Sequence, residues 1–246
     1  MSAFYIKVIA VVAMFIDHLA AVFPEIFPFF FRGIGRISFP IFAYFIAEGF
    51  NHTKSPKNFL LRLGAFALIS EPFYDWALQH GSTRWHVDFF ANTNIFYTLF
   101  LGGLSIYLYQ RIAAKVHPKL SFVGYAPMLL LCLVSIIFST DYSIYGVILI
   151  FLLYVTVVFK ELQGKKRIAM LAGAFLLPYV DYLNRIFNFS GANLSDWFMI
   201  LGIATAIVLL MCYNGERGKP LKWVFYVVYP AHLAVLGIIA QMFFFP

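Results

Sequence analysis

The residues best suited to chemistry are the adjacent pair Asp17 and His18, together with Arg36, all set in apolar sequence. An imidazole can take up and return a proton near neutral pH. A carboxylate beside it can orient the ring and stabilise its charged form, while a guanidinium can hold an anion or a developing oxyanion. This combination suits acyl transfer, in which His18 would take a proton from the attacking amine or hydroxyl.

Each of these residues also has a purely structural explanation. Asp17 could serve only as the counter-charge of Arg36, His18 could have a structural role, and His232 could be an ordinary hydrogen-bonded residue of a helix. Asp181 and Arg185 are four residues apart, so they could simply pair with each other on one helix face. These alternatives stay open at the level of sequence.

Further ionisable side chains in or beside apolar segments could support the same site; they are Glu71, Asp75, Asp141, Asp181 and His232. Ionisable groups inside a bilayer are costly unless they are paired, so each one is a functional hypothesis. With a helical rise of about 1.5 Å per residue, Asp17, Glu71 and Asp181 would share one depth in the outer half of the membrane. The same layer could instead relay protons, so a proton-coupled membrane transporter is the main alternative, and a non-enzymatic assembly factor is a third.

The elements that must position these residues are membrane helices. Of the 246 residues, 62% are hydrophobic and only 12% are charged, and the mean hydropathy is +0.83. Soluble domains carry about 25% charged residues, so lipid must surround most of this chain. We expect an all-α, polytopic transmembrane bundle that forms a single domain over residues 1–246. About nine spans of the length that a bilayer requires are expected, over residues 3–23, 35–50, 58–78, 95–112, 122–138, 142–159, 168–187, 197–213 and 223–245.

Basic residues set the expected orientation. With the N-terminus in the cytoplasm, all but four of the 18 Lys and Arg residues fall on the cytoplasmic side, the exceptions being Arg32, Arg36, Arg84 and Arg185. The net charge of +7 is therefore read as a marker of topology, and we expect no nucleic-acid partner. The first segment carries Asp17 and His18, which a cleaved signal peptide avoids, so it is read as the first span.

Small residues predict which face of the first helix is buried. Ala10, Ala13, Asp17, Ala20 and Ala21 fall on one stripe at intervals of three and four residues. Small side chains allow a neighbouring helix to approach closely. Asp17 is therefore predicted to point into the bundle, away from lipid.

An acyl donor from the cytoplasm would need positive charge at the inner rim of the bundle. Candidates to bind the phosphates of acetyl-CoA are Lys54, Lys57, Arg62, Arg217 and Lys219. The glycine-containing segment 213–218 could cradle a phosphate or be only a tight turn. The two cysteines, Cys132 and Cys212, lie in apolar segments and make no metal motif, so no metal is expected.

Several motifs spread along nearly the whole chain resemble the TraX family. They are Ile16-Asp17-His18, Gly35-Arg36-Ile37-Ser38-Phe39-Pro40 with Glu48-Gly49, Ser70-Glu71-Pro72-Phe73, Asp141-Tyr142-Ser143, Tyr213-Asn214-Gly215-Glu216-Arg217-Gly218 and Tyr229-Pro230-Ala231-His232. The resemblance implies an acetyl-CoA-dependent N-acetyltransferase of the bacterial inner membrane. His18 would be the catalytic base, with Asp17 and Arg36 in supporting roles. The acceptor would be an amine of a pilin amino terminus, another peptide or a small molecule, and the outer loop 79–91 would influence its choice.

Overall fold

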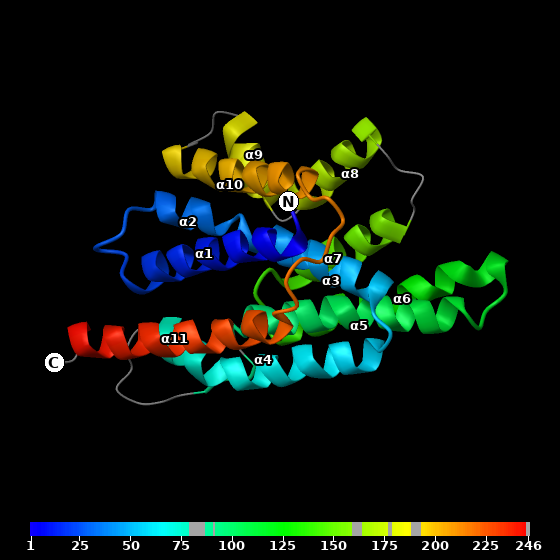
Figure 1. Ribbon diagram of the computed structural model, residues 1–246, viewed down its shortest axis with the longest axis horizontal. Coiled ribbons are helices and arrows are strands. Elements are labelled where there is room, and N and C mark those ends of the chain that lie inside the picture. Colours follow the sequence, from blue (N-terminus) through cyan, green and yellow to red (C-terminus); the bar gives the residue numbers. More distant parts are fainter. Residues whose placement is uncertain (79–86, 91, 159–163, 177–178, 188–192, 245–246) are drawn as a thin grey trace. The chain divides into compact units, whose positions relative to one another are not determined.

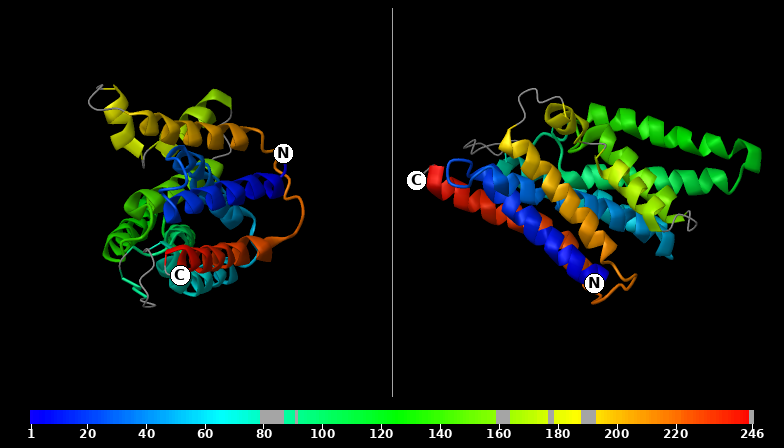
Figure 2. Two further views of the ribbon diagram at one scale, coloured as in Figure 1. Left: turned by 90° about the vertical axis from the view of Figure 1, so that its left-hand side faces the viewer. Right: turned by 90° about the horizontal axis from the view of Figure 1, so that it is seen from above.

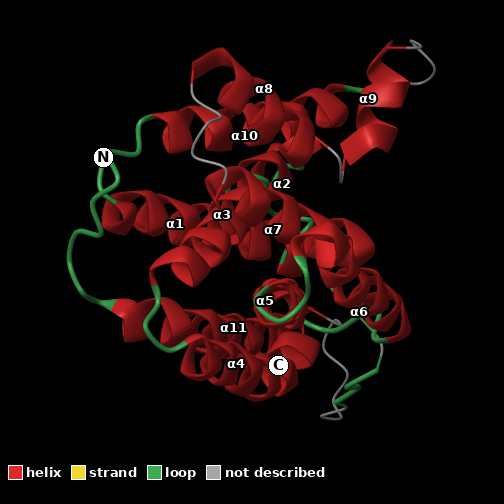
Figure 3. Ribbon diagram, turned by 90° about the vertical axis from the view of Figure 1, so that its right-hand side faces the viewer, coloured by secondary structure: helices red, strands yellow, loops and turns green. Residues whose placement is uncertain are grey.

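The computed structural model describes residues 1–78, 87–90, 92–158, 164–176, 179–187 and 193–244, and these contain helices and no strand (Figure 3). The elements, coloured along the chain in Figure 1, are α1 Ala3–Val22, α2 Phe30–Gly35, α3 Ser38–His52, α4 Pro56–Leu78, α5 Ile95–Ala113, the 3₁₀ helix Pro118–Tyr125, α6 Ala126–Ile137, α7 Ser143–Val158, α8 Gly164–Leu176, α9 Val180–Phe187, α10 Leu194–Met211 and α11 Lys222–Phe244. The predicted all-α class is confirmed.

Each of the nine predicted segments coincides with helix, but three of them are divided, and the one over 122–138 runs from the 3₁₀ helix into α6. In place of the expected helix over 35–50, the structure has α2 followed by α3. Helical structure therefore begins at Phe30, before Arg32. Pro40 lies in the first turn of α3, where a missing N–H costs no hydrogen bond, so it accompanies a new helix start. The expected helix over 168–187 is likewise two helices, because α8 ends at Leu176 and α9 begins at Val180.

Four segments in the described part of the chain are long and apolar enough to cross a membrane. They are Ala3–Val22, Phe30–His52, Leu194–Met211 and Lys222–Phe243. Shorter apolar helices cover Phe122–Ile137 and Ser143–Val155. These helices fit a multi-pass membrane protein, whereas the nine crossings and the cytoplasmic N-terminus stay predictions.

The contacts divide the chain into two compact units. Unit 1 comprises Met1–Phe42, Pro72–Val87 and Leu171–Pro246, and unit 2 comprises Ala43–Glu71 and Asp88–Met170. In unit 1, α2 packs on both α1 and α10, and α11 also contacts α1 (Figure 2). In unit 2, α5 packs against α6 and α7. The expectation of a single domain stays a prediction.

Helix α1 separates small buried residues from large exposed ones. Ala10 and Ala13 are buried, whereas Val8, Val12 and Phe15 are exposed at 38–53% of their surface. Exposed apolar stripes of this kind are rare on soluble proteins, but they are what lipid requires. The predicted inward face of α1 is therefore confirmed at Ala10 and Ala13.

Glycines allow α2 to approach its neighbours closely in unit 1. A Cβ atom on Gly33 would lie 2.7 Å from the backbone oxygen of Phe198 in α10. A Cβ on Gly202 of α10 would in turn collide with the backbone oxygen of Gly33, and one on Gly35 would collide with the side chain of Asp17. Close backbone approach through small residues is a common way for membrane helices to associate. It fixes α2, and the arginines around it, against α1.

The N-terminal residues bind the connection between α10 and α11. The backbone N–H of Ala3 donates to the oxygen of Glu216 at 2.8 Å, and that of Asn214 donates to the oxygen of Met1 at 3.0 Å. These bonds place Lys7, near the start of α1, at the same end of unit 1 as the basic connection. That agrees with the predicted topology, which puts both on one side of the membrane.

Candidate functional site

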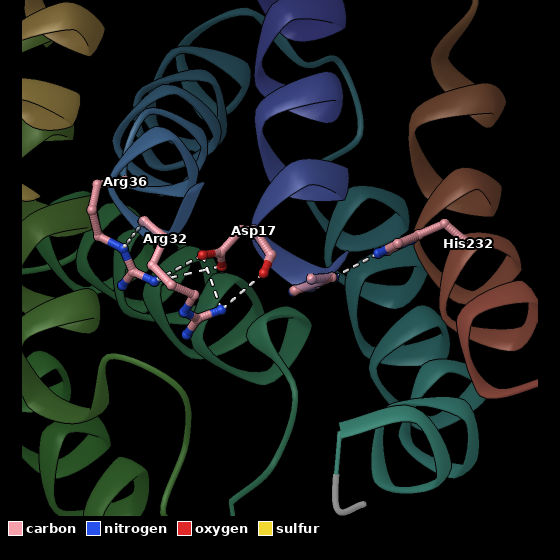
Figure 4. Close-up of polar contacts among 5 residues, drawn as sticks. Asp17, Arg32, Arg36 and His232 are labelled. Carbon is pink, nitrogen blue, oxygen red and sulfur yellow. Dashed lines mark hydrogen bonds and ion pairs between the residues drawn. The ribbon is translucent and has the colours of Figure 1, made fainter. Parts of the chain in front are cut away.

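A carboxylate and two guanidinium groups meet between α1 and the α2 segment (Figure 4). Nη1 of Arg32 lies 2.9 Å from Oδ1 of Asp17, and Nη2 of Arg36 lies 3.4 Å from the same oxygen and 3.5 Å from Oδ2. Arg32 also donates to the backbone oxygen of Asp17 at 3.1 Å. Two guanidinium groups therefore bind one carboxylate within this cluster.

Local structure explains why these three side chains meet. Arg32 and Arg36 are four residues apart on one helical turn, and Nε of Arg36 donates to the backbone oxygen of Arg32 at 3.2 Å. Gly35 lacks the side chain that would otherwise collide with Asp17. Asp17 lies on the same face of α1 as the buried Ala10 and Ala13, so the helix turns its carboxylate toward α2.

A second polar pair lies on the neighbouring side of α1, where it meets α11. Nδ1 of His18 is 2.6 Å from Nε2 of His232. The ring planes differ by only 6° and the ring centroids are 4.9 Å apart. Because two nitrogens are much closer than the centroids, the rings meet edge to edge through a hydrogen bond. Nδ1 of His232 is also 2.9 Å from the backbone oxygen of Val228, one turn earlier in α11.

The Asp17 carboxylate does not orient the His18 ring, and the alternative in which Asp17 is a counter-charge for Arg36 agrees with the structure. Within the described residues, Asp17 binds the two arginines and the ring of His18 binds His232 (Figure 4). Consecutive residues of a helix point about 100° apart, so the two side chains face different neighbours. The histidine of α11, and not the aspartate, orients His18.

Glu71 has a structural role in unit 2. Its Oε2 accepts a hydrogen bond from the backbone N–H of Asn94 at 3.1 Å and another from the side-chain amide of Asn94. Asn94 caps α5, because its Oδ1 accepts from the N–H of Phe96 at 2.9 Å. The carboxylate thus lies at the positive end of the α5 dipole, where a negative charge is stabilising.

The other predicted supporting residues are dispersed. Asp75 is buried near the end of α4, in unit 1, whereas Asp141 is exposed before α7, in unit 2. The side chain of Asp181 lies outside the described residues. Arg185, offered as its partner, makes a two-pronged pair with Asp196 of α10, with N–O distances of 2.7 and 3.3 Å.

The residues predicted to bind acetyl-CoA are divided between the two units. Exposed Lys54 and Lys57 and the partly buried Arg62 belong to unit 2, and the exposed Arg217 and Lys219 belong to unit 1. The basic rim therefore stays a prediction. The loop 79–91, predicted to influence acceptor choice, lies almost entirely outside the described residues.

The segment 213–218 is a turn. Gly215 and Gly218 have positive φ angles of 80° and 71°, which favour glycine. The N–H of Asn214 is bonded to Met1, and that of Glu216 is bonded to Oδ1 of Asn214. Protein oxygens already accept from these two N–H groups, which favours the turn, and the phosphate cradle stays a prediction.

Sequence reasoning missed two features of the site. A second helix that starts at Gly35, as the apolar pattern predicts, leaves Arg32 in a loop, whereas the spacing of four residues between Arg32 and Arg36 is the signal that places both on one helical turn. The bond between His18 and His232 joins residues 214 positions apart, and nothing in either local sequence indicates that partnership.

The fold and site together define a helical protein with membrane-length segments and a charged cluster held within one of its compact units. The chain belongs to the TraX family, whose sequence profile, described as TraX protein, matches residues 2–240. It is 30% identical over 244 residues to "Probable fimbrial assembly protein FimC, serogroup H1" of Dichelobacter nodosus, a match that covers 96% of this chain and 94% of that protein. It is also 25% identical over 231 residues to "Uncharacterized protein RP591" of Rickettsia prowazekii (strain Madrid E), covering 89% and 83%. No solved structure matches the chain.

Proposed function

We propose that this TraX-family protein is an integral-membrane acetyltransferase that moves the acetyl group of acetyl-CoA to an amine. The observation that carries the proposal is a partly exposed imidazole, His18, whose ring is held by His232 and whose helix neighbour, Asp17, binds two arginines. A positioned base and nearby positive charge are the two requirements of acyl transfer.

In the proposed reaction, the amine nitrogen attacks the thioester carbonyl carbon of acetyl-CoA. A C–N bond forms, the C–S bond breaks, and His18 takes the proton that the amine loses. His18 then returns that proton to the departing thiolate, so the products are the N-acetyl compound and free coenzyme A. The guanidinium groups of Arg32 and Arg36, one residue along α1 from His18 through Asp17, support stabilisation of the oxyanion, or binding of an anionic group of the acceptor.

The acceptor that we propose is the amino terminus of a fimbrial subunit. The support for it is the name of the D. nodosus relative, a probable fimbrial assembly protein that aligns with nearly the whole chain. The phosphates of the donor would bind basic residues of one unit, either Lys54, Lys57 and Arg62 of unit 2 or Arg217 and Lys219 of unit 1.

The test is transfer from radiolabelled acetyl-CoA by the full-length protein in lipid nanodiscs. Acceptors would be a peptide with a free fimbrial-type amino terminus and the same peptide with a blocked one. We expect label in the free peptide only, lost in His18→Ala and kept in His52→Ala, an exposed histidine of α3. Absence of product with every acceptor, together with proton-driven uptake in vesicles, would favour the transporter alternative.

A further inference from the structure

We propose that His232 is a positioning residue that fixes which nitrogen of His18 carries the proton, so that Nε2 of His18 is the basic atom. The order of hydrogen bonds follows from contacts within unit 1 alone. The use of Nε2 as the base in acetyl transfer rests on the proposed function. An experiment can therefore refute the hydrogen-bond order and the use of Nε2 as a base independently of each other.

The directions of the hydrogen bonds follow from a backbone carbonyl at one end of the chain of contacts. The oxygen of Val228 can only accept, so Nδ1 of His232, 2.9 Å away, must carry a hydrogen. A neutral imidazole has a single N–H, and Nε2 of His232 is therefore a lone-pair acceptor. Nδ1 of His18, 2.6 Å from that nitrogen, must then be the donor. This leaves the lone pair of His18 on Nε2.

Burial assigns different roles to the two histidines. His232 is only 7% exposed, whereas His18 is partly exposed. The rings of Phe15 and Tyr229 meet His232 edge to face, with centroids 6.1 and 5.4 Å away. Aromatic walls exclude water, which strengthens the hydrogen bond that they enclose. His18 is thus the more exposed member of the pair. We therefore assign contact with the substrate to His18, and His232 acts through it.

The hydrogen bond between His18 and His232 becomes stronger when His18 takes a proton. An imidazolium at His18 would carry hydrogens on both nitrogens, and its Nδ1–H would then donate a charge-assisted bond to His232. Such a bond is stronger in the transition state than in the ground state, which is the condition for faster catalysis. The neutral ring of His232, itself held by Val228, would thus orient the ring of His18 and stabilise its charged form.

The hydrogen-bond order can be tested without any reaction. Full-length protein in nanodiscs, labelled with ¹⁵N in its histidine rings, would give NMR signals assigned through His18→Gln and His232→Gln. At neutral pH we expect both rings to be protonated on Nδ1 and unprotonated on Nε2. A His18 ring protonated on Nε2 alone, or a spectrum of His18 unchanged by His232→Leu, would overturn the proposal.

Activity provides the second readout. The side-chain oxygen of glutamine can accept from Nδ1 of His18, whereas leucine of similar size cannot. General-base catalysis contributes about 10²- to 10⁴-fold, so we expect His232→Leu to lower kcat by about 10- to 100-fold with KM nearly unchanged, and His232→Gln to restore most of it. Equal losses in both variants, with matching thermal unfolding temperatures, would contradict a positioning role. A wild-type protein that transfers no acetyl group would refute the proposed function, and the NMR result would still decide the hydrogen-bond order.

Discussion

The two units each hold a buried carboxylate, and they use it differently. In unit 2, Glu71 and Asn94 are both fully buried, and one oxygen of the carboxylate receives two hydrogen bonds at the start of α5. In unit 1, the side chain of Asp17 is 13% exposed, and those of Arg36 and Arg32 are 16% and 30% exposed. The first group is enclosed, whereas the second retains accessible charge.

This difference shows that burial of an ionisable residue does not by itself identify a functional site. Glu71 stabilises a helix end, a role that needs neither solvent nor substrate. The Asp17 cluster holds two guanidinium groups and lies one residue along α1 from His18, which is partly exposed. Accessible donors beside a partly exposed imidazole are the features that favour chemistry in unit 1.

The largest expected effect is on transfer by His18→Gln. Loss of a general base typically lowers a rate by about 10²- to 10⁴-fold, and we expect a fall in kcat in that range. Glu71→Gln, in unit 2, should keep kcat close to the wild-type value. Steady-state kinetics in nanodiscs would measure both. A comparable fall in kcat for the two variants would remove the distinction between the units.

The next effect is on stability, through Asp17→Asn. This change removes the charged carboxylate that both Arg32 and Arg36 bind. Breaking a buried ion pair by removing one partner costs about 3–5 kcal/mol, and partial exposure places the expected loss of unfolding free energy near the lower end. The double variant Asp17→Asn with Arg36→Gln removes both charges, and it should recover part of the lost unfolding free energy. Thermal unfolding in detergent measures this, and no recovery in the double variant would count against the pairing.

A smaller loss is expected from Gly35→Ala. The added methyl would collide with the side chain of Asp17, and overpacking of this kind costs about 1–3 kcal/mol. Gly173 of α8 is the matched control, because a Cβ there meets nothing within 4 Å. Gly173→Ala should instead stabilise by up to about 1 kcal/mol through helix propensity. Equal unfolding temperatures for the two variants would contradict the close approach of α2 to α1.

The smallest effect is that of Glu71→Gln on unfolding. The amide can still accept a hydrogen bond from Asn94, but it brings no negative charge to the start of α5. Loss of a helix-end charge and weakening of the capping bonds cost about 1–2 kcal/mol together. Asn94→Ala should give a similar loss, and the double variant should lose less than the sum. Additive losses would show that the two side chains act independently.

The sequence predicts the helices better than it predicts their partners. Apolar length alone locates helix in every expected segment, since a span requires a long apolar stretch whatever it packs against. The Ala10–Asp17 stripe also predicts which face of α1 is buried. The division into α2 and α3 was not expected, and the misplaced start excluded Arg32 from the site.

Contacts between segments that are distant in sequence cannot be predicted from apolar length or spacing. The bond from His18 to His232 depends on how α11 packs beside α1, and periodicity within one helix carries no information on that. The expected pairing of Asp17 with His18 could have been rejected from sequence, because neighbouring residues of a helix point in different directions. Asp17 and His18 are neighbours in sequence, but their side chains do not meet in space.

The central claim is that an imidazole at position 18 takes a proton during acetyl transfer, and chemical rescue tests it most directly. Transfer by His18→Ala in nanodiscs would be measured while free imidazole is added. We expect the variant to be nearly inactive alone and to regain activity in proportion to imidazole, while the wild-type rate is unaffected. Wild-type activity in His18→Ala, with no response to imidazole, would contradict the claim.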